Sequence, residues 1–149
     1  MTRQMHSEEY DDPEIQTHWV TEERRKLIEY LHREDVDHGG VPDEPDWLVA
    51  PHLAIWRIMS IKAPGAVGWW AISGDVPTDY ISSGGIPDAR TGMVKFSEHW
   101  SELSQCMLQG LPHPDVKIGT SDQWPKLGDL LLRRANLLAE IAAEDENWQ

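Results

Sequence analysis

The residue types best suited to acid–base chemistry gather in one short stretch that follows an apolar run. Asp75 and Asp79 flank Thr78, and Tyr80 follows directly. General acid–base catalysis uses two carboxyl groups held at a set separation in a cleft, and His52 is available as an additional base. The same residues can instead serve the fold, because Asp and Thr side chains accept backbone N–H groups in turns. Both interpretations stay open, together with a third in which the stretch is a binding surface.

Other kinds of catalytic or cofactor site lack their sequence signals. Seven histidines are present, but none has the H-E-x-x-H spacing or the cysteine pair of a zinc site. The single cysteine, Cys106, lies in an apolar helical pattern, which argues against a reactive, exposed thiol. Neither the G-x-S-x-G nor the G-x-x-x-x-G-K motif occurs. We therefore expect no metal and no cofactor.

Two adjacent tryptophans, Trp69 and Trp70, come just before the acidic stretch. Neighbouring side chains of a strand point to opposite faces, so one ring should enter a helix-covered core. The other ring must face a second layer, a groove or solvent. An exposed tryptophan beside a polar turn is typical of an interface hot spot. The candidate binding residues are therefore Trp69, Trp70, Asp75, Thr78, Asp79 and Tyr80.

These residues must be positioned by an apolar hairpin. Two strands are predicted, over residues 48–62 and 67–73, with a Pro-Gly turn between them. The first strand is apolar on both faces, which favours a strand covered on two sides over a rival helix. Residues 74–77 must end the second strand, and Thr78 is expected to cap a short turn.

Three amphipathic helices are predicted around this hairpin. The first begins at the capping signal Asp12-Pro13 and ends at Gly39-Gly40, and the others cover residues 88–109 and 124–144. The fold class is α+β, an antiparallel β-hairpin or small sheet packed by about three helices, in the order α-β-β-α-α. Residues 1–11 are expected to fray, and residues 12–149 to form a single compact domain.

The charge of the chain limits its partners. The formal net charge is -13, and residues 1–46 alone hold fourteen acidic and five basic residues. Nucleic acid or an anionic membrane would need a basic face, so neither is expected as a partner. The acidic first third is either a solvated helix or a face for a basic protein. No secretory signal and no apolar run of about 18 residues is visible, so a cytoplasmic location is expected.

The run G-W-W-A-I-S-G-D-V-P-T-D-Y-I, from Gly68 to Ile81, resembles a bacterial family known as domain of unknown function 4826. The likeness extends to H-G-G at residues 38–40 and to H-P-D at residues 113–115, and it covers most of the chain from about Trp19. It implies a compact domain of bacterial origin with the Asp75–Tyr80 stretch as its signature, and it implies no activity. A shorter pattern, G-W-x-x-x-x-G-D followed by a tyrosine, is similar to some immunity proteins of bacterial toxin systems.

Three hypotheses of function follow. The preferred one is a small acidic module that binds another protein, of the immunity or regulatory-partner type, without catalysis. It depends on the net charge, on eight tryptophans against one phenylalanine, and on the missing catalytic motifs. The second is an enzyme whose site is built around Asp75, Thr78, Asp79 and Tyr80. The third is a homodimer that pairs through the hairpin edge or through an exposed tryptophan.

Overall fold

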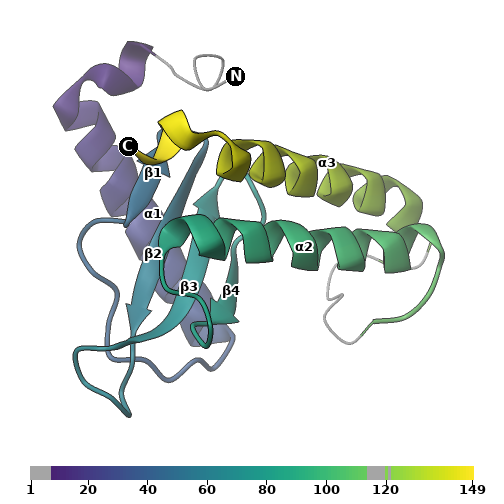
Figure 1. Cartoon of the computed structure of the whole chain (residues 1–149), viewed down its shortest axis with the longest axis horizontal. Helices are drawn as coiled ribbons and strands as arrows, with labels where there is room; N and C mark the ends of the chain where they lie inside the picture. Colours follow the sequence, from purple (N-terminus) through teal and green to yellow (C-terminus); the bar gives the residue numbers. More distant parts are fainter. Residues whose placement is uncertain (1–7, 114–119, 121) are drawn as a thin grey trace. The chain divides into compact units, whose positions relative to one another are not determined.

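The computed structural model describes residues 8–113, 120 and 122–149, which form two compact units that meet in sequence between Gly92 and Met93 (Figure 1). The elements are η2 (Glu8–Asp11, a 3-10 helix), α1 (Pro13–Arg33), β1 (Trp47–Val49), β2 (Leu53–Met59), β3 (Val67–Gly74), β4 (Asp79–Ser82), α2 (Ala89–Leu108), α3 (Trp124–Ala143) and η3 (Asp145–Trp148, a 3-10 helix). The predicted α+β class is confirmed. Of the segment expected to fray, residues 1–7 lie outside the described residues, and the rest forms η2.

The sheet of the first unit has four antiparallel strands in the order β1-β2-β3-β4. The predicted hairpin is confirmed as β2 and β3, which pair with Trp56 opposite Ala71. The prediction of one strand over residues 48–62 is wrong, because Leu48 and Val49 belong to β1, which turns back and pairs with the start of β2. The prediction of a short turn after Thr78 is wrong, because Asp79 pairs with Ile72 and begins β4. Strands of three and four residues, such as β1 and β4, are too short for a clear alternation of apolar and polar residues.

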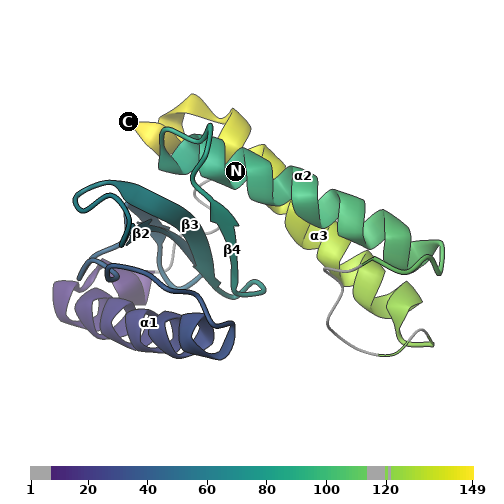
Figure 2. The same ribbon diagram turned by 90° about the horizontal axis from the view of Figure 1, so that it is seen from below.

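The first unit has its core between α1 and one face of this sheet (Figure 2). Leu27 and Leu31 of α1 are fully buried with Trp56 and Ile58 of β2. Ile55, on the other face of β2, is also fully buried. The prediction of a strand with two buried faces is therefore confirmed.

Helix α1 begins as predicted and ends earlier. The Asp12 side chain accepts a hydrogen bond from the Glu14 backbone N–H at 2.9 Å, as an N-cap residue does. At the other end, Asp35 takes a positive φ of 56°, and the Val36 N–H donates to the Leu31 carbonyl at 3.0 Å. This is a Schellman ending formed around an aspartate, where glycine is the usual residue. The prediction that the helix runs to Gly39-Gly40 is therefore wrong.

The two glycines instead fasten the chain to the end of β2. The Gly39 N–H donates to the Met59 carbonyl at 2.7 Å, and the Met59 N–H donates to the Gly40 carbonyl at 3.0 Å. A Cβ atom on Gly39 would lie 2.8 Å from the Ser60 carbonyl oxygen, so no side chain fits there. The His38 ring accepts the Gly40 N–H through Nδ1 at 3.0 Å, which gives the whole H-G-G motif a structural role.

The second unit consists of the main part of α2, with α3 and η3. The two long helices lie side by side in both ribbon views (Figures 1 and 2). The buried Ser97 hydroxyl of α2 donates to the Ala135 carbonyl of α3 at 2.8 Å. Gly128 allows a close approach, because a Cβ atom there would be 3.1 Å from Met107 Cβ. Both helices have the predicted positions within one residue at each end.

Candidate functional site

The signature turn, residues 74–79, joins β3 to β4 and is held against the turn between β1 and β2. The Asp75 N–H donates to the His52 carbonyl at 2.7 Å. Gly74 has a φ of 123°, and a Cβ atom on it would lie 2.6 Å from Leu53 Cα and still closer to the His52 carbonyl oxygen. The glycine therefore lets two turns pack backbone to backbone, and this packing presents Asp75 at an exposed position.

Of the three other polar side chains of the signature, Asp79 and Tyr80 lie at the start of β4 and Thr78 directly precedes it. Asp79 is half-buried, and its Oδ1 accepts the N–H of Tyr80 at 2.8 Å. The Tyr80 ring packs edge-on against Tyr30 of α1, with 6.1 Å between centroids and 67° between ring planes. Thr78 is half-buried in the turn. The signature thus serves the fold through Asp79 and joins β4 to the last third of α1 through Tyr80.

The Tyr30 hydroxyl lies in an environment that disfavours its ionised form. Burial raises the pKa of Tyr30 well above its usual range, and the negative charge of Asp79, followed by that of Glu34, raises the pKa further. The folded protein therefore favours the protonated hydroxyl of Tyr30, which raises the pKa of that group.

This shift predicts a loss of stability in alkaline solution. The folded-state pKa of Tyr30 is raised, so its contribution is complete below the unfolded-state pKa of about 10 and is lost as pH rises above that value. We expect the free energy of unfolding of the wild type to fall more steeply between about pH 9 and pH 11 than that of Tyr30→Phe. Urea titrations followed by circular dichroism at a series of pH values measure both slopes. Equal slopes would show that Tyr30 titrates alike in both states.

The two tryptophans lie on opposite faces of β3, as strand alternation predicts. Trp69 is half-buried and packs against the core beneath α1. Trp70 is 1% exposed, and its indole N–H donates to the Ile86 carbonyl at 3.0 Å. Trp70 is therefore a core residue with a satisfied donor, and Trp69 is the partly accessible member of the pair.

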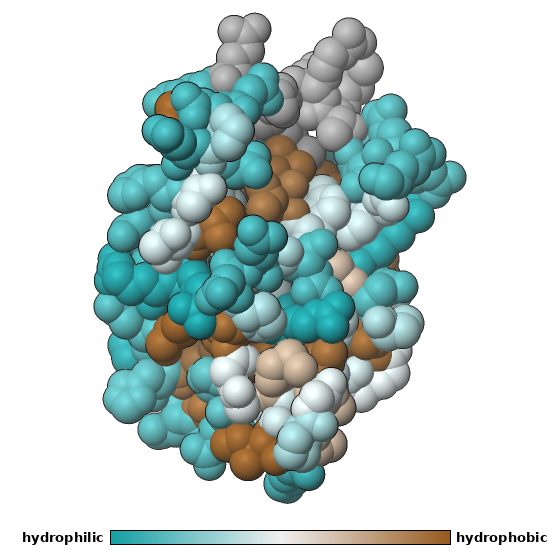
Figure 3. Space-filling view, turned by 90° about the vertical axis from the view of Figure 1, so that its left-hand side faces the viewer, coloured by the Kyte–Doolittle hydropathy of each residue, from teal (hydrophilic) through white to brown (hydrophobic). Residues whose placement is uncertain are grey.

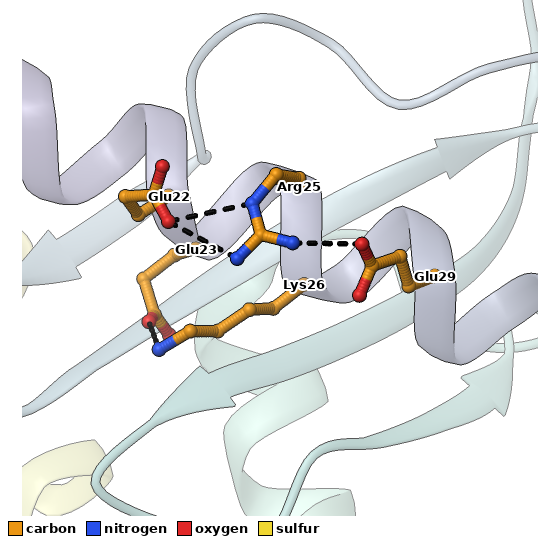
Figure 4. A network of polar contacts seen from close by, with 5 residues as sticks. All are labelled: Glu22, Glu23, Arg25, Lys26 and Glu29. Atoms are coloured by element: carbon orange, nitrogen blue, oxygen red, sulfur yellow. Dashed lines mark hydrogen bonds and ion pairs between the residues drawn. The ribbon is translucent and has the colours of Figure 1, made fainter.

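The outward face of α1 carries a network of charges (Figure 4). The Arg25 guanidinium lies between two carboxylates, 3.1 Å from Glu22 Oε2 and 2.7 Å from Glu29 Oε1. The hydrogen bonds that Arg25 donates to Glu22 and the charges of both glutamates raise the pKa of Arg25. Beside this network, Lys26 Nζ lies 3.4 Å from the buried Glu23. These basic side chains are therefore neutralised within the helix.

Two further arginines of the first unit are engaged in the same way. Arg24 donates to the Val41 carbonyl at 2.7 Å and to the Pro42 carbonyl at 3.1 Å. Arg57 forms a two-pronged ion pair with Asp46, at 2.9 and 2.8 Å, which raises the pKa of Arg57. Many acidic residues of this unit are exposed, among them Glu9, Asp11, Asp12, Glu14, Glu29, Asp35, Asp37, Asp43, Glu44, Asp75 and Asp88.

Sequence reasoning missed two arrangements in this region, the contact between Tyr30 and Tyr80 and the fastening of the loop by Arg24. Both contacts join residues far apart in the chain, so no local spacing of residue types indicates them. Tyr30 does lie three residues after Leu27, at the border of the apolar stripe of α1, which is the one signal of a packed ring.

The described residues form neither a metal-binding cluster nor a membrane-spanning helix. No group of three His, Cys, Asp or Glu side chains there is arranged to hold a metal ion. None of the helices formed by those residues is long and apolar enough to cross a membrane. Of the H-P-D motif, only His113 is described, and its ring lies 6.5 Å from that of His99.

Comparison with known proteins adds one finding to this geometry. Searches of the curated proteins and of the solved structures give no match to the chain. A family model does match, over residues 13–148, and that range includes the signature turn, both tryptophans and the whole of α1. The chain belongs to the family described as Domain of unknown function (DUF4826).

Proposed function

We propose that this protein is a small acidic module that binds a basic partner protein, in the manner of an immunity or regulatory partner, and catalyses no reaction. The proposed contact surface is on the first unit. It includes the exposed carboxylates of α1 and of the loop that follows it. The surface also includes Asp75, Thr78 and Asp79 from the signature turn and Tyr80 from β4. Trp69 and Trp70 belong to the adjoining strand β3, where Trp69 is half-buried and Trp70 is buried.

The observation that carries the proposal is the excess of exposed carboxylates over basic side chains in the first unit, where Arg33 and Lys62 are exposed as well. Arg24, Arg25, Lys26 and Arg57 all have acceptors within the first unit. Acids of the same unit such as Asp37 and Glu44 are exposed. A surface of this kind attracts a basic protein over a distance of about a Debye length, roughly 8–10 Å, and repels an acidic one.

The contact between Tyr80 and Tyr30 supports the inclusion of the signature turn. It brings β4 to the end of α1 that carries Glu34 and Asp35. Tyrosine is enriched at protein interfaces because its ring is large and its hydroxyl is polar. Acidic and aromatic groups therefore adjoin here, although the sequence separates them by about fifty residues.

The surface character agrees with polar recognition. Hydrophilic side chains cover most of the face shown in Figure 3, and hydrophobic side chains appear on it as separate patches. Recognition through charges sets the association rate and the choice of partner more than the final affinity. The expected complex is therefore sensitive to salt.

The proposal is tested by affinity capture from bacterial cells that carry the gene. The bait is wild type or a variant in which Asp37, Asp43, Glu44 and Asp75 are all replaced by lysine. We expect the wild type to retain a basic protein that the variant loses at least tenfold, since each reversal replaces an attraction by a repulsion. Circular dichroism establishes that both baits are folded.

A matched variant separates this surface from net charge alone. Replacement of Glu98, Glu102, Asp129 and Glu140 by lysine changes the charge equally at exposed positions of the second unit. We expect this variant to retain the partner. Equal loss in both variants, or a wild type that retains no specific protein, would contradict the proposal.

A further inference from the structure

A groove runs along α1 in the first unit, beside the loop that leads into β1. Its volume is about 640 Å³, within the usual range of about 300–1,000 Å³ for binding pockets. Its lining comes from the middle of α1, from loop residues 43–45 and from Leu48 of β1. It lies entirely within one compact unit.

Arg24 builds one wall of this groove. Its guanidinium donates to the Val41 and Pro42 carbonyls, and its Nε lies 3.9 Å from Asp43 Oδ1. These contacts fix the start of the loop to α1, so the residues that follow stand opposite the helix. The wall is thus held by hydrogen bonds to the backbone, and the groove is a fixed feature of the unit.

The floor of the groove is apolar. Val20 belongs to the buried core, and Ile28 and Leu48 pack partly buried against that core. An occupant with aliphatic groups would cover these side chains and remove them from water, a favourable change of roughly 25 cal/mol per Å² of apolar area.

The rim of the groove is acidic. Asp43 has 99% of its side chain exposed, and Glu44 and Glu29 are exposed as well. The rim also carries two arginines, of which Arg25 is paired with Glu29 at 2.7 Å and Arg24 lies 3.9 Å from Asp43. Three acids against two arginines leave the rim with a net negative charge above the aliphatic floor, and the exposed Asp43 and Glu44 are its most accessible carboxylates.

We propose that this groove holds a lysine- or arginine-bearing segment of the basic partner, an inference that rests on the proposed function. Lysine and arginine carry an aliphatic stem that covers apolar surface and a charged head that remains at its edge. The stems lie over Val20, Ile28 and Leu48, and the heads reach the exposed Asp43 and Glu44. An acidic segment would meet like charge, and a purely apolar one would leave the rim unmatched.

Defined peptides test the groove directly. The probe is a fluorescein-labelled octapeptide of alternating lysine and valine, titrated with the full chain and followed by fluorescence anisotropy. We expect saturable binding to wild type, and binding at least tenfold weaker for Asp43→Lys/Glu44→Lys. The matched peptide of alternating glutamate and valine is expected not to bind. A wild type that does not bind the lysine peptide would overturn the proposal.

Two variants show where the peptide binds. Thr21 is exposed and lines the groove, so Thr21→Tyr adds bulk without charge and is expected to weaken binding at least tenfold. Glu102→Lys/Glu140→Lys makes the same charge change as the rim variant on the second unit and is expected to bind within about twofold of wild type. Unchanged binding by Thr21→Tyr, or an equal loss in the control, would overturn the groove as the site.

The capture experiment distinguishes failure of the groove from failure of the proposed function. A partner that is lost by the fourfold variant and kept by Asp43→Lys/Glu44→Lys leaves the proposed function standing and rejects the groove. Sedimentation velocity measures whether the chain dimerises, and so tests whether a second copy of this chain occupies the groove. If wild type dimerises and Thr21→Tyr is a monomer, the groove holds another copy of this chain, which also rejects a basic partner there.

Discussion

Replacement of Gly74 by alanine is expected to destabilise the protein by about 3–5 kcal/mol, a large fraction of the roughly 5–15 kcal/mol that holds a domain folded. Two effects add. Gly74 has a φ of 123°, which costs any residue with a Cβ atom. The new Cβ atom would also lie 2.6 Å from Leu53 Cα and closer still to the His52 carbonyl oxygen, and both are backbone atoms that no rotamer change can remove. The midpoint and slope of urea unfolding measure the loss.

Gly85→Ala is the matched control for this substitution. Gly85 also has a positive φ, of 75°, but a Cβ atom there would meet nothing within 4 Å. Gly85→Ala should lower the free energy of unfolding only by the cost of a positive φ for a residue with a Cβ atom, about 1–2 kcal/mol. The difference between the two variants isolates the packing of the signature turn on the turn before β2. Equal losses would mean that the close approach at Gly74 contributes nothing.

Replacement of Trp56 by alanine is expected to cost about 3–5 kcal/mol and to be the most damaging change in the core beneath α1. The Trp56 ring is fully buried between α1 and the sheet, so the substitution leaves a cavity that its neighbours can fill only in part. Trp56 also donates its indole N–H to the buried Ser73 hydroxyl at 3.0 Å. Far-UV circular dichroism in urea measures the loss. A loss below about 1 kcal/mol would contradict the packing described.

Ser73→Ala tests the hydrogen bond of Trp56 separately. It removes the acceptor and leaves a buried indole N–H without one, at a cost of about 1–3 kcal/mol. Trp56→Phe removes the donor and retains most of the ring. The double variant removes both partners, so it should be more stable than the sum of the single losses predicts. Strict additivity would show that the bond carries no coupling energy.

Much of the fold could be predicted because the relevant signals are local. The stripe that ends in Leu27 and Leu31 shows α1, and the apolar run around Ile55 and Trp56 shows a strand with two buried faces. Two errors had a physical cause. Asp35 took the left-handed conformation that usually selects glycine, so α1 ended before Gly39-Gly40. The sequence did not indicate the strand β4, because four residues are too few to show an alternation of apolar and polar side chains.

Less of the candidate site could be predicted. The types of residue at Asp75, Asp79 and Tyr80 were visible, and so was the acidic first third of the chain. Their adjacency was not, because Tyr80 reaches Tyr30 only after the chain has crossed the whole sheet. The groove beside α1 was equally hidden. It exists because Arg24 is bonded to the carbonyls of Val41 and Pro42, and nothing in the sequence marks which acceptors an arginine will choose.

The central claim is that the acidic surface of the first unit attracts a basic partner protein. The most direct test is the association rate with the captured partner, measured by stopped-flow fluorescence from about 0.05 to about 0.3 M salt. For wild type and for the fourfold variant of the second unit, we predict a rate that falls at least tenfold over this range. For the variant with Asp37, Asp43, Glu44 and Asp75 replaced by lysine, we predict a slow rate that salt does not lower. Rates that agree between this variant and wild type at every salt concentration would contradict the account.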